Sequence, residues 1–178
     1  MKYVALNAPD TIQDYPMGHE WFQLYFNGNH ISNAGAKEYD VAKKKISENV
    51  EKIYNSISLL LENLNLKTTD CFVMGFSQGG MMAFELGQIL QNKLAGLAII
   101  SSRIISKEHK PNNAFLKTPI FISHGAQDAV LPISNYNESL EVLKKYNYNY
   151  ENYLIKSDEH TMSQETITLF QNFIKKNI

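Results

Sequence analysis

The feature of this sequence that most constrains its fold is a repeated alternation of short apolar runs with longer amphipathic segments. Three apolar runs have the length of strands, at residues 71–75, 94–101 and 119–123. Residues 148–155 alternate aromatic and polar side chains before an apolar end, as an edge strand would. Between and after them, apolar residues recur every three or four positions, as in a helix with one buried side. Strands that alternate with helices of this length predict an α/β protein, with a mostly parallel sheet and helices on both of its faces.

The first third of the chain has a weaker pattern. Residues 3–8 predict a short strand. Residues 11–36 carry Trp21 and Phe22 among several glycines and asparagines without a clear period, which predicts a long irregular segment that acts as a lid or a binding wall. From about Glu38 the spacing becomes helical, and we expect one long amphipathic helix there.

Composition narrows the class of protein. A length of 178 residues with 44% hydrophobic residues fits one globular domain over residues 1–178. The formal net charge of −1 gives no electrostatic reason to expect nucleic acid or an anionic membrane as a partner. The apolar runs are too short to cross a bilayer, which takes roughly 20 residues, and the first residues do not form a signal peptide, so no integral membrane segment is expected.

The single cysteine points to a reducing compartment. Cys71 excludes an internal disulfide framework, and its place inside an apolar run favours a small buried side chain over a reactive thiol. We therefore expect the protein to be cytoplasmic.

A chemical motif lies where the run 71–75 gives way to the next helical pattern. Residues 75–79 read Gly-Phe-Ser-Gln-Gly, the pattern of a nucleophile elbow. In such an elbow, a strand passes directly into a helix, and the corner residue takes a strained backbone conformation that projects its hydroxyl above the sheet. Ser77 is thus the candidate nucleophile, and the backbone N–H of Gln78 at the helix start is a candidate oxyanion donor. The alternative is a plain structural turn.

A nucleophilic serine needs a base and a carboxylate that orients the base. Asp128 follows the strand-like run 119–123, and His160 follows the last such run. Carboxyl ends of parallel strands meet at one edge of a sheet, so both residues are expected on the same edge as Ser77. The order Ser, Asp, His along the chain is the order in which a triad follows a nucleophile elbow in this architecture.

Other residues compete for these roles. His124 is an alternative base that more simply hydrogen-bonds locally, and His19, His30 and His109 are expected to be solvated or structural. Asp158 and Glu159 are alternative acids, but neighbours one or two positions away from a histidine rarely face its ring correctly. No histidine or cysteine pair has zinc-ligand spacing and no phosphate-binding glycine loop occurs, so we expect no metal and no cofactor.

With these residues in place, the sequence resembles the acyl-protein thioesterase/carboxylesterase (phospholipase–carboxylesterase) family of α/β-hydrolases. The resemblance rests on motifs along nearly the whole chain: Asn7-Ala-Pro9, Trp21-Phe22, Gly75-Phe-Ser-Gln-Gly-Gly80, Leu94-Ala-Gly-Leu97, and His124-Gly125 with Asp128 and Pro132. It departs at Gln23, where the family has an aspartate. A glycine that often precedes the family's histidine is also absent before His160.

The resemblance implies an α/β-hydrolase fold and a Ser77–His160–Asp128 triad. It implies hydrolysis of carboxylic esters or thioesters of acyl chains, as in acyl-protein thioesterases, lysophospholipases and carboxylesterases. No cofactor is implied. Trp21 and Phe22 fall at the family's Trp-Phe site and are expected to bear on the substrate, although core packing explains them equally well.

The family has further strands before the first one found here, and one of them ends in a His-Gly-Leu-Gly-like loop with the second oxyanion donor. We therefore expect an N-terminally shortened fold and slower catalysis, since one lost donor costs about 10²–10³ in rate. The alternative function is an impaired or inactive hydrolase relic that associates through an exposed sheet edge, for example as a homodimer.

Overall fold

The computed structural model describes residues 2–12, 15–31 and 35–178, without the side chains of Pro16, Asn29 and His30. The chain divides into two compact units, Met1–Ser56 and Ile57–Ile178. The expectation of one domain over residues 1–178 stays a prediction. No helix in these described ranges has the length and apolar character that a membrane span requires.

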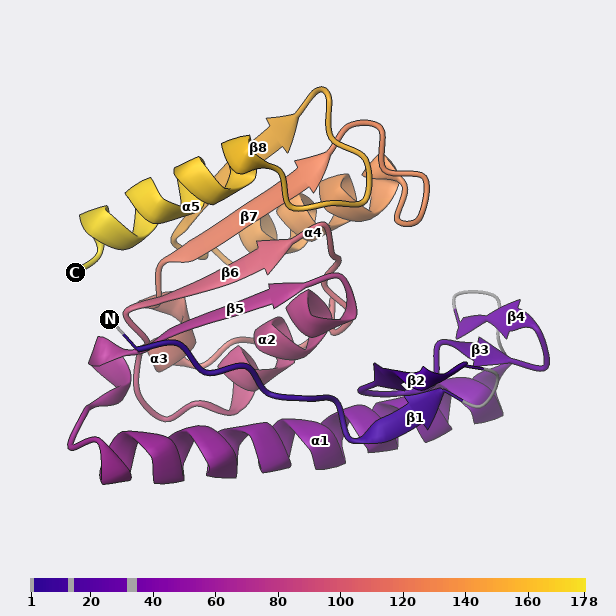
Figure 1. Cartoon of the computed structure of the whole chain (residues 1–178), viewed down its shortest axis with the longest axis horizontal. Coiled ribbons are helices and arrows are strands. Elements are labelled where there is room, and N and C mark those ends of the chain that lie inside the picture. Colours follow the sequence, from indigo (N-terminus) through magenta and orange to yellow (C-terminus); the bar gives the residue numbers. More distant parts are fainter. Residues whose placement is uncertain (1, 13–14, 32–34) are drawn as a thin grey trace. The chain divides into compact units, whose positions relative to one another are not determined.

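The first unit contains two small antiparallel pairs of strands (Figure 1). Strand β1 (Asp10–Ile12) pairs with β2 (Tyr15–Glu20), and β3 (Tyr25–Phe26) pairs with β4 (Asn29–His30). The expectation of an irregular segment here was wrong. The pairing of β3 with β4 has a local cause. Asn27 and Gly28 both have positive φ, at 49° and 78°, which is the backbone of a two-residue hairpin turn.

The strand expected at residues 3–8 is also wrong. These residues adopt no regular secondary structure and are mostly exposed, with Tyr3 85% exposed. An apolar run alone does not make a strand, because a strand also needs a partner for its backbone N–H and C=O groups.

Helix α1 (Ala36–Asn63) confirms the long amphipathic pattern. Its buried residues recur at three- and four-residue steps, as in Ala42, Ile46, Val50 and Ile53. The side chain of Asn49 on the same side is buried and donates to the carbonyl oxygen of Trp21 within the first unit.

The second unit is built on a four-stranded sheet. Its strands are β5 (Phe72–Phe76), β6 (Gly96–Ile100), β7 (Ile120–Gly125) and β8 (Tyr150–Ile155), in the order β5-β6-β7-β8. All three pairings are parallel. The four strand-like runs of the sequence therefore form one parallel sheet, as predicted.

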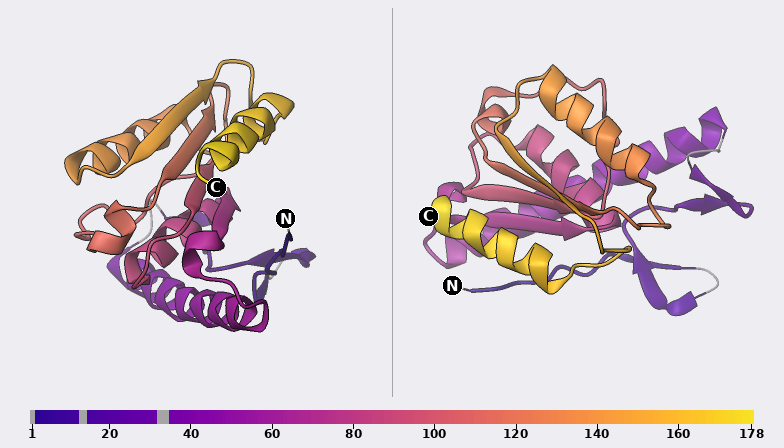
Figure 2. Two further views of the ribbon diagram at one scale, coloured as in Figure 1. Left: turned by 90° about the vertical axis from the view of Figure 1, so that its left-hand side faces the viewer. Right: turned by 90° about the horizontal axis from the view of Figure 1, so that it is seen from above.

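Helices cover both faces of this sheet. Between the strands run α2 (Gln78–Ile89), the short α3 (Asn113–Leu116) and α4 (Ile133–Lys145), and α5 (Gln164–Lys176) follows β8. Figure 2 shows α5 on one face, and α2 and α4 on the other. This arrangement confirms the α/β class with helices on both faces.

The core lies around the two central strands. Every residue of β6 and β7 is buried, and on the α5 face a cluster of Ala98, Ile100, Phe121 and Phe173 fills the space between helix and sheet. Because all four strands run in one direction, their carboxyl ends share one edge of the sheet, and the loops after β5, β7 and β8 start there.

Candidate active site

The corner between β5 and α2 has the strained backbone of an elbow. Ser77 stands between the two elements with φ 52° and ψ −122°, outside the regions that residues with a side chain normally occupy. Backbone bonds hold it there: its N–H donates to Ile100 O at 2.9 Å, and its carbonyl accepts from Gly80 N–H at 3.0 Å. The hydroxyl of Ser102 donates to the same carbonyl oxygen.

The glycines of the motif are not equally constrained. A Cβ on Gly75 would lie 2.0 Å from the backbone oxygen of Gly79, so only glycine fits there. A Cβ on Gly79 would meet nothing within 4 Å, whereas one on Gly80 would lie 2.6 Å from Ser102 Cβ. Close packing in this motif is therefore found at Gly75 and Gly80.

The structure brings Ser77, His160 and Asp128 together in one chain of hydrogen bonds. Ser77 Oγ lies 3.0 Å from His160 Nε2, and His160 Nδ1 lies 2.8 Å from Asp128 Oδ2. A carboxylate only accepts, so His160 carries its hydrogen on Nδ1 and leaves Nε2 to accept from the serine hydroxyl. This is the order of contacts that a nucleophile, a base and an orienting acid require.

Asp128 is held from both of its oxygens. Its Oδ1 accepts from the N–H groups of Val130 at 2.9 Å and Leu131 at 2.8 Å, while Oδ2 takes the bond from His160. Burial alone would raise the pKa of this carboxyl group, but these hydrogen bonds outweigh burial and hold the pKa of Asp128 below its ordinary value. The carboxylate is therefore ionised at neutral pH.

His160 sits between the acid and the serine with part of its ring accessible. Its side chain is 18% exposed, whereas that of Asp128 is 0% exposed. The ring of Phe76 lies against the imidazole, with 4.9 Å between the ring centroids. The loop that carries His160 is also tied to the end of β6, since Ser101 Oγ donates to Thr161 O at 3.1 Å.

Ser101 and Ser102 hydrogen-bond to the loop of His160 and to the elbow, and the sequence analysis assigned them no role. Both are buried, and Ser101 has a positive φ of 43°. The available signal was their position at the end of the run 94–101 and directly after it, at the carboxyl end of the strand next to the elbow strand.

The competing residues have other partners. His124 Nε2 bonds to Leu131 O at 2.8 Å, and the carboxylate of Asp158 accepts from Thr166 Oγ1 at 3.3 Å. Glu159 and His19 are exposed. The side chain of His30 lies outside the described part of the chain.

Gln78, Trp21 and Phe22 complete the predicted site residues. Gln78 is the first residue of α2, so its backbone N–H belongs to the helix start beside Ser77. Trp21 and Phe22 belong to the first compact unit, where Phe22 is 2% exposed and Trp21 is partly buried. Their role in substrate binding stays a prediction.

Burial raises the pKa of the Cys71 thiol, which agrees with the expectation of an unreactive side chain. Within residues 2–12, 15–31 and 35–178, no group of three or more His, Cys, Asp or Glu residues is arranged to hold a metal ion.

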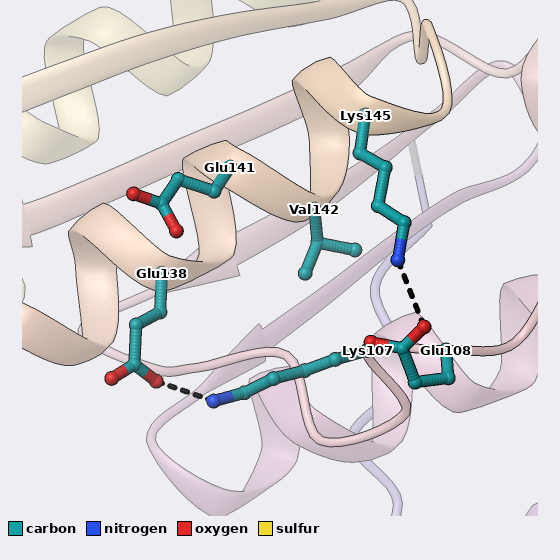
Figure 3. A pocket seen from close by; sticks show the side chains of 6 residues that line it. All are labelled: Lys107, Glu108, Glu138, Glu141, Val142 and Lys145. Atoms are coloured by element: carbon teal, nitrogen blue, oxygen red, sulfur yellow. Dashed lines mark hydrogen bonds and ion pairs between the residues drawn. The ribbon is translucent and has the colours of Figure 1, made fainter.

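A hollow of ≈ 220 Å³ lies on the surface beside α4 (Figure 3). Four of its charged side chains form two ion pairs, Lys107 with Glu138 and Lys145 with Glu108 at 2.8 Å, and Glu141 adds one excess negative charge to the lining. Exposed pairs of this kind contribute little energy, and the hollow carries none of the three hydrogen-bonded residues.

Comparison with known proteins adds to this geometry. The model of the family described as Phospholipase/Carboxylesterase matches residues 1–178. Acyl-protein thioesterase 1 of Saccharomyces cerevisiae is 30% identical over 156 residues, which are 79% of this chain and 66% of the yeast protein. Acyl-protein thioesterase 1 of Gibberella zeae is 25% identical over 186 residues, which are 100% of this chain and 77% of that protein.

A solved structure, that of esterase PE8, shares the fold with a TM-score of 0.80 at 22% identity, over 97% of this chain and 76% of that chain. The chain thus spans slightly less than two thirds of the yeast relative and about three quarters of the others.

Proposed function

Because the chain belongs to the phospholipase/carboxylesterase family, we propose that it is a serine hydrolase that cleaves carboxylic esters or thioesters of acyl chains. One observation carries this proposal: the continuous hydrogen bonds from Ser77 Oγ through His160 to Asp128. The names of its relatives, acyl-protein thioesterase 1 and esterase, support the same reaction class.

In the proposed mechanism, Ser77 Oγ attacks the acyl carbon while its proton passes to His160 Nε2. The resulting oxyanion accepts a hydrogen bond from Gln78 N–H at the start of α2. When the tetrahedral intermediate collapses, the alcohol or thiol leaves with the proton from His160. Water then attacks the acyl-enzyme with His160 as base, and a carboxylic acid and free Ser77 are released.

Asp128 has two roles in this mechanism. Its ionised carboxylate fixes the hydrogen of His160 on Nδ1, and it stabilises the imidazolium that forms in each step. The lowered pKa of Asp128 supports this role, since the group keeps its charge when the histidine becomes positive.

The substrate part of the proposal is coarser. We assign an acyl chain bound to oxygen or sulfur, and we propose that the protein works in the cytoplasm. The site as proposed needs no cofactor.

The experiment is hydrolysis of p-nitrophenyl acetate and of longer-chain esters by the wild type and by Ser77→Ala and Asp128→Asn. Ser77→Ala should fall to near the uncatalysed rate, and Asp128→Asn should lose about 10⁴ in kcat through the wrong imidazole tautomer. Ser134→Ala, an exposed serine on α4, is the matched control and should retain the wild-type rate. Equal rates for wild type and Ser77→Ala above the buffer blank would reject Ser77 as nucleophile.

A second candidate function is association without efficient catalysis. The observation that favours it is the edge of the sheet: among the described strands, β5 is hydrogen-bonded only to β6, and Met74 on it is 46% exposed. A fluorophosphonate probe separates the two candidates, because stoichiometric labelling of Ser77 requires an activated serine. Elution as a monomer at high concentration in size-exclusion chromatography would count against association.

A further inference from the structure

The imidazole of His124 lies behind the acid, at the carboxyl end of β7. Its side chain is 0% exposed, and its Nε2 is 2.8 Å from the carbonyl oxygen of Leu131. A carbonyl oxygen only accepts, so Nε2 carries the hydrogen of this bond. The bond closes the loop that contains Asp128, because it joins the end of strand β7 to the far end of that loop.

Leu131 is consequently held on both sides of its backbone. Its N–H donates to Asp128 Oδ1 at 2.8 Å, and its C=O accepts from His124. The same Nε2 lies 3.6 Å from Asp128 Oδ2, the oxygen that receives the bond from His160. The positive end of the Nε2–H dipole therefore lies near the charge of the carboxylate that orients the proposed base.

The other side of the ring is fixed by α4. The ring of Tyr136 stacks on His124 with 5.5 Å between centroids and 25° between planes, and Tyr136 Oη donates to Asn152 Oδ1 at 3.2 Å. The imidazole thus has one orientation, set by a buried aromatic ring on one side and by the Leu131 carbonyl at its edge.

Packing alone does not account for a histidine here. Its Nδ1 is buried and has no hydrogen-bond partner in the described part of the structure. A buried polar atom without a partner costs stability, and an apolar ring of similar shape would avoid that cost. The nitrogen that does have a partner is the one directed at the Asp128 loop.

We propose that His124 is a positioning residue: through the Leu131 peptide it sets the direction of the Asp128 carboxylate, so that Oδ2 meets His160 Nδ1. Its catalytic meaning rests on the proposed hydrolase function. Without the donor on His124, the Leu131 carbonyl loses its partner, the peptide rotates, and the carboxylate no longer faces the base squarely.

Three variants separate the hydrogen bond from the shape of the ring. His124→Gln keeps an N–H donor near the place of Nε2, His124→Asn has the same amide at a shorter reach, and His124→Phe keeps a ring without a donor. We expect His124→Phe and His124→Asn to lose about 10- to 100-fold in kcat for p-nitrophenyl acetate with KM within about twofold of wild type, since small displacements of a catalytic group cost this much. His124→Gln should stay within about threefold of wild type, a rescue expected of the retained donor. His109→Phe, an exposed histidine, is the matched control.

A second readout does not depend on turnover. The proton shared by His160 Nδ1 and Asp128 gives a downfield proton NMR signal, assigned by its loss in Asp128→Asn. We expect the signal in wild type and His124→Gln, and its loss or broadening in His124→Phe and His124→Asn, with circular dichroism showing that each variant is folded.

The outcomes are distinct. Folded His124→Phe and His124→Asn with wild-type kcat and an unchanged signal would overturn the proposal, and so would a His124→Gln variant as impaired as His124→Phe. If the wild type hydrolyses no ester, the proposed function fails, while the NMR comparison still decides whether His124 positions the carboxylate.

Discussion

Strands β5 and β7 both lead into residues of the proposed triad, yet they are enclosed very differently. Met74 on β5, Ala98 on β6 and Phe121 on β7 stand in one register row and point to the same face of the sheet. Along this row the exposed fraction falls from 46% at Met74 to 0% at Ala98 and 0% at Phe121. The α5 face is therefore filled over the central strands and open at Met74. Phe72 at the start of β5 still packs against Phe173 of α5, with 6.3 Å between the ring centroids.

The two proposed catalytic ends differ in the same way. Asp128 after β7 is buried and receives three hydrogen bonds, with His124 behind it. Ser77 after β5 keeps its positive φ through backbone hydrogen bonds to Ile100 and Gly80, beside the close backbone contact at Gly75. The acid is thus held by satisfied polar contacts inside a core, whereas the nucleophile is held by backbone geometry.

The largest effect on stability is expected at Gly75. In Gly75→Ala the new Cβ meets backbone atoms of Gly79 and Gly80 at 2.0–2.4 Å, which no side-chain movement relieves. We expect a loss of about 4–5 kcal/mol or more in the free energy of unfolding, measured by urea denaturation.

The matched control is Gly79→Ala, where the added methyl group meets nothing within 4 Å. Because Gly79 lies in the first turn of α2, alanine should be neutral or stabilise by up to about 1 kcal/mol. Equal stability of the two variants would contradict the assignment of the strain to Gly75.

The fall in exposure along this row is tested by truncating the side chains of Phe121 and Met74 to alanine. Phe121→Ala removes a ring from the cluster under α5 and should cost about 3–5 kcal/mol in the free energy of unfolding, because a cavity remains. Met74→Ala on the same face should cost about 1 kcal/mol or less, since the side chain is 46% exposed.

Thermal and urea unfolding of the two variants measure this difference. A loss at Met74 as large as that at Phe121 would mean that the β5 end of the face is covered in solution, and it would strengthen the case for association through that edge.

Much of this arrangement was predictable from the sequence. The apolar runs at the two central strands predicted the parallel sheet, because buried parallel strands are continuously apolar. The mixed pattern of residues 148–155 predicted the edge strand β8. The order Ser77, Asp128, His160 at three strand ends predicted residues that the structure brings within hydrogen-bond distance.

Other parts depended on information that periodicity does not carry. The residues 3–8 look like a strand but adopt no strand, since pairing partners are not encoded locally. The hairpin at Asn27-Gly28 has a local signal in the dipeptide itself, but glycines and asparagines are frequent throughout residues 11–36 and make that signal weak. The contact of Ser101 with Thr161 could not be predicted, because it connects segments 60 residues apart in the chain. The local hydrogen bond expected of His124 is found at Leu131, seven residues further on.

Raising the pH tests how well water is excluded from the β7 side of the sheet. Burial raises the pKa of Tyr136 to about 12, against about 10 in an unfolded chain. Between these two pKa values the unfolded chain has already released the proton of Tyr136, whereas the native state still binds it. The free energy of unfolding therefore keeps the full contribution of this group below about pH 10 and loses it as the pH rises toward 12. The loss from this group is roughly 2–3 kcal/mol.

Tyr136→Phe removes the titrating hydroxyl and should flatten the decline in urea-derived unfolding free energy over this range. The contribution of Tyr148, whose pKa is also raised by burial, should remain. An identical decline in wild type and Tyr136→Phe would show that water reaches the ring that stacks on His124, and the contrast between the enclosed β7 side and the open β5 side would then be smaller than the structure indicates.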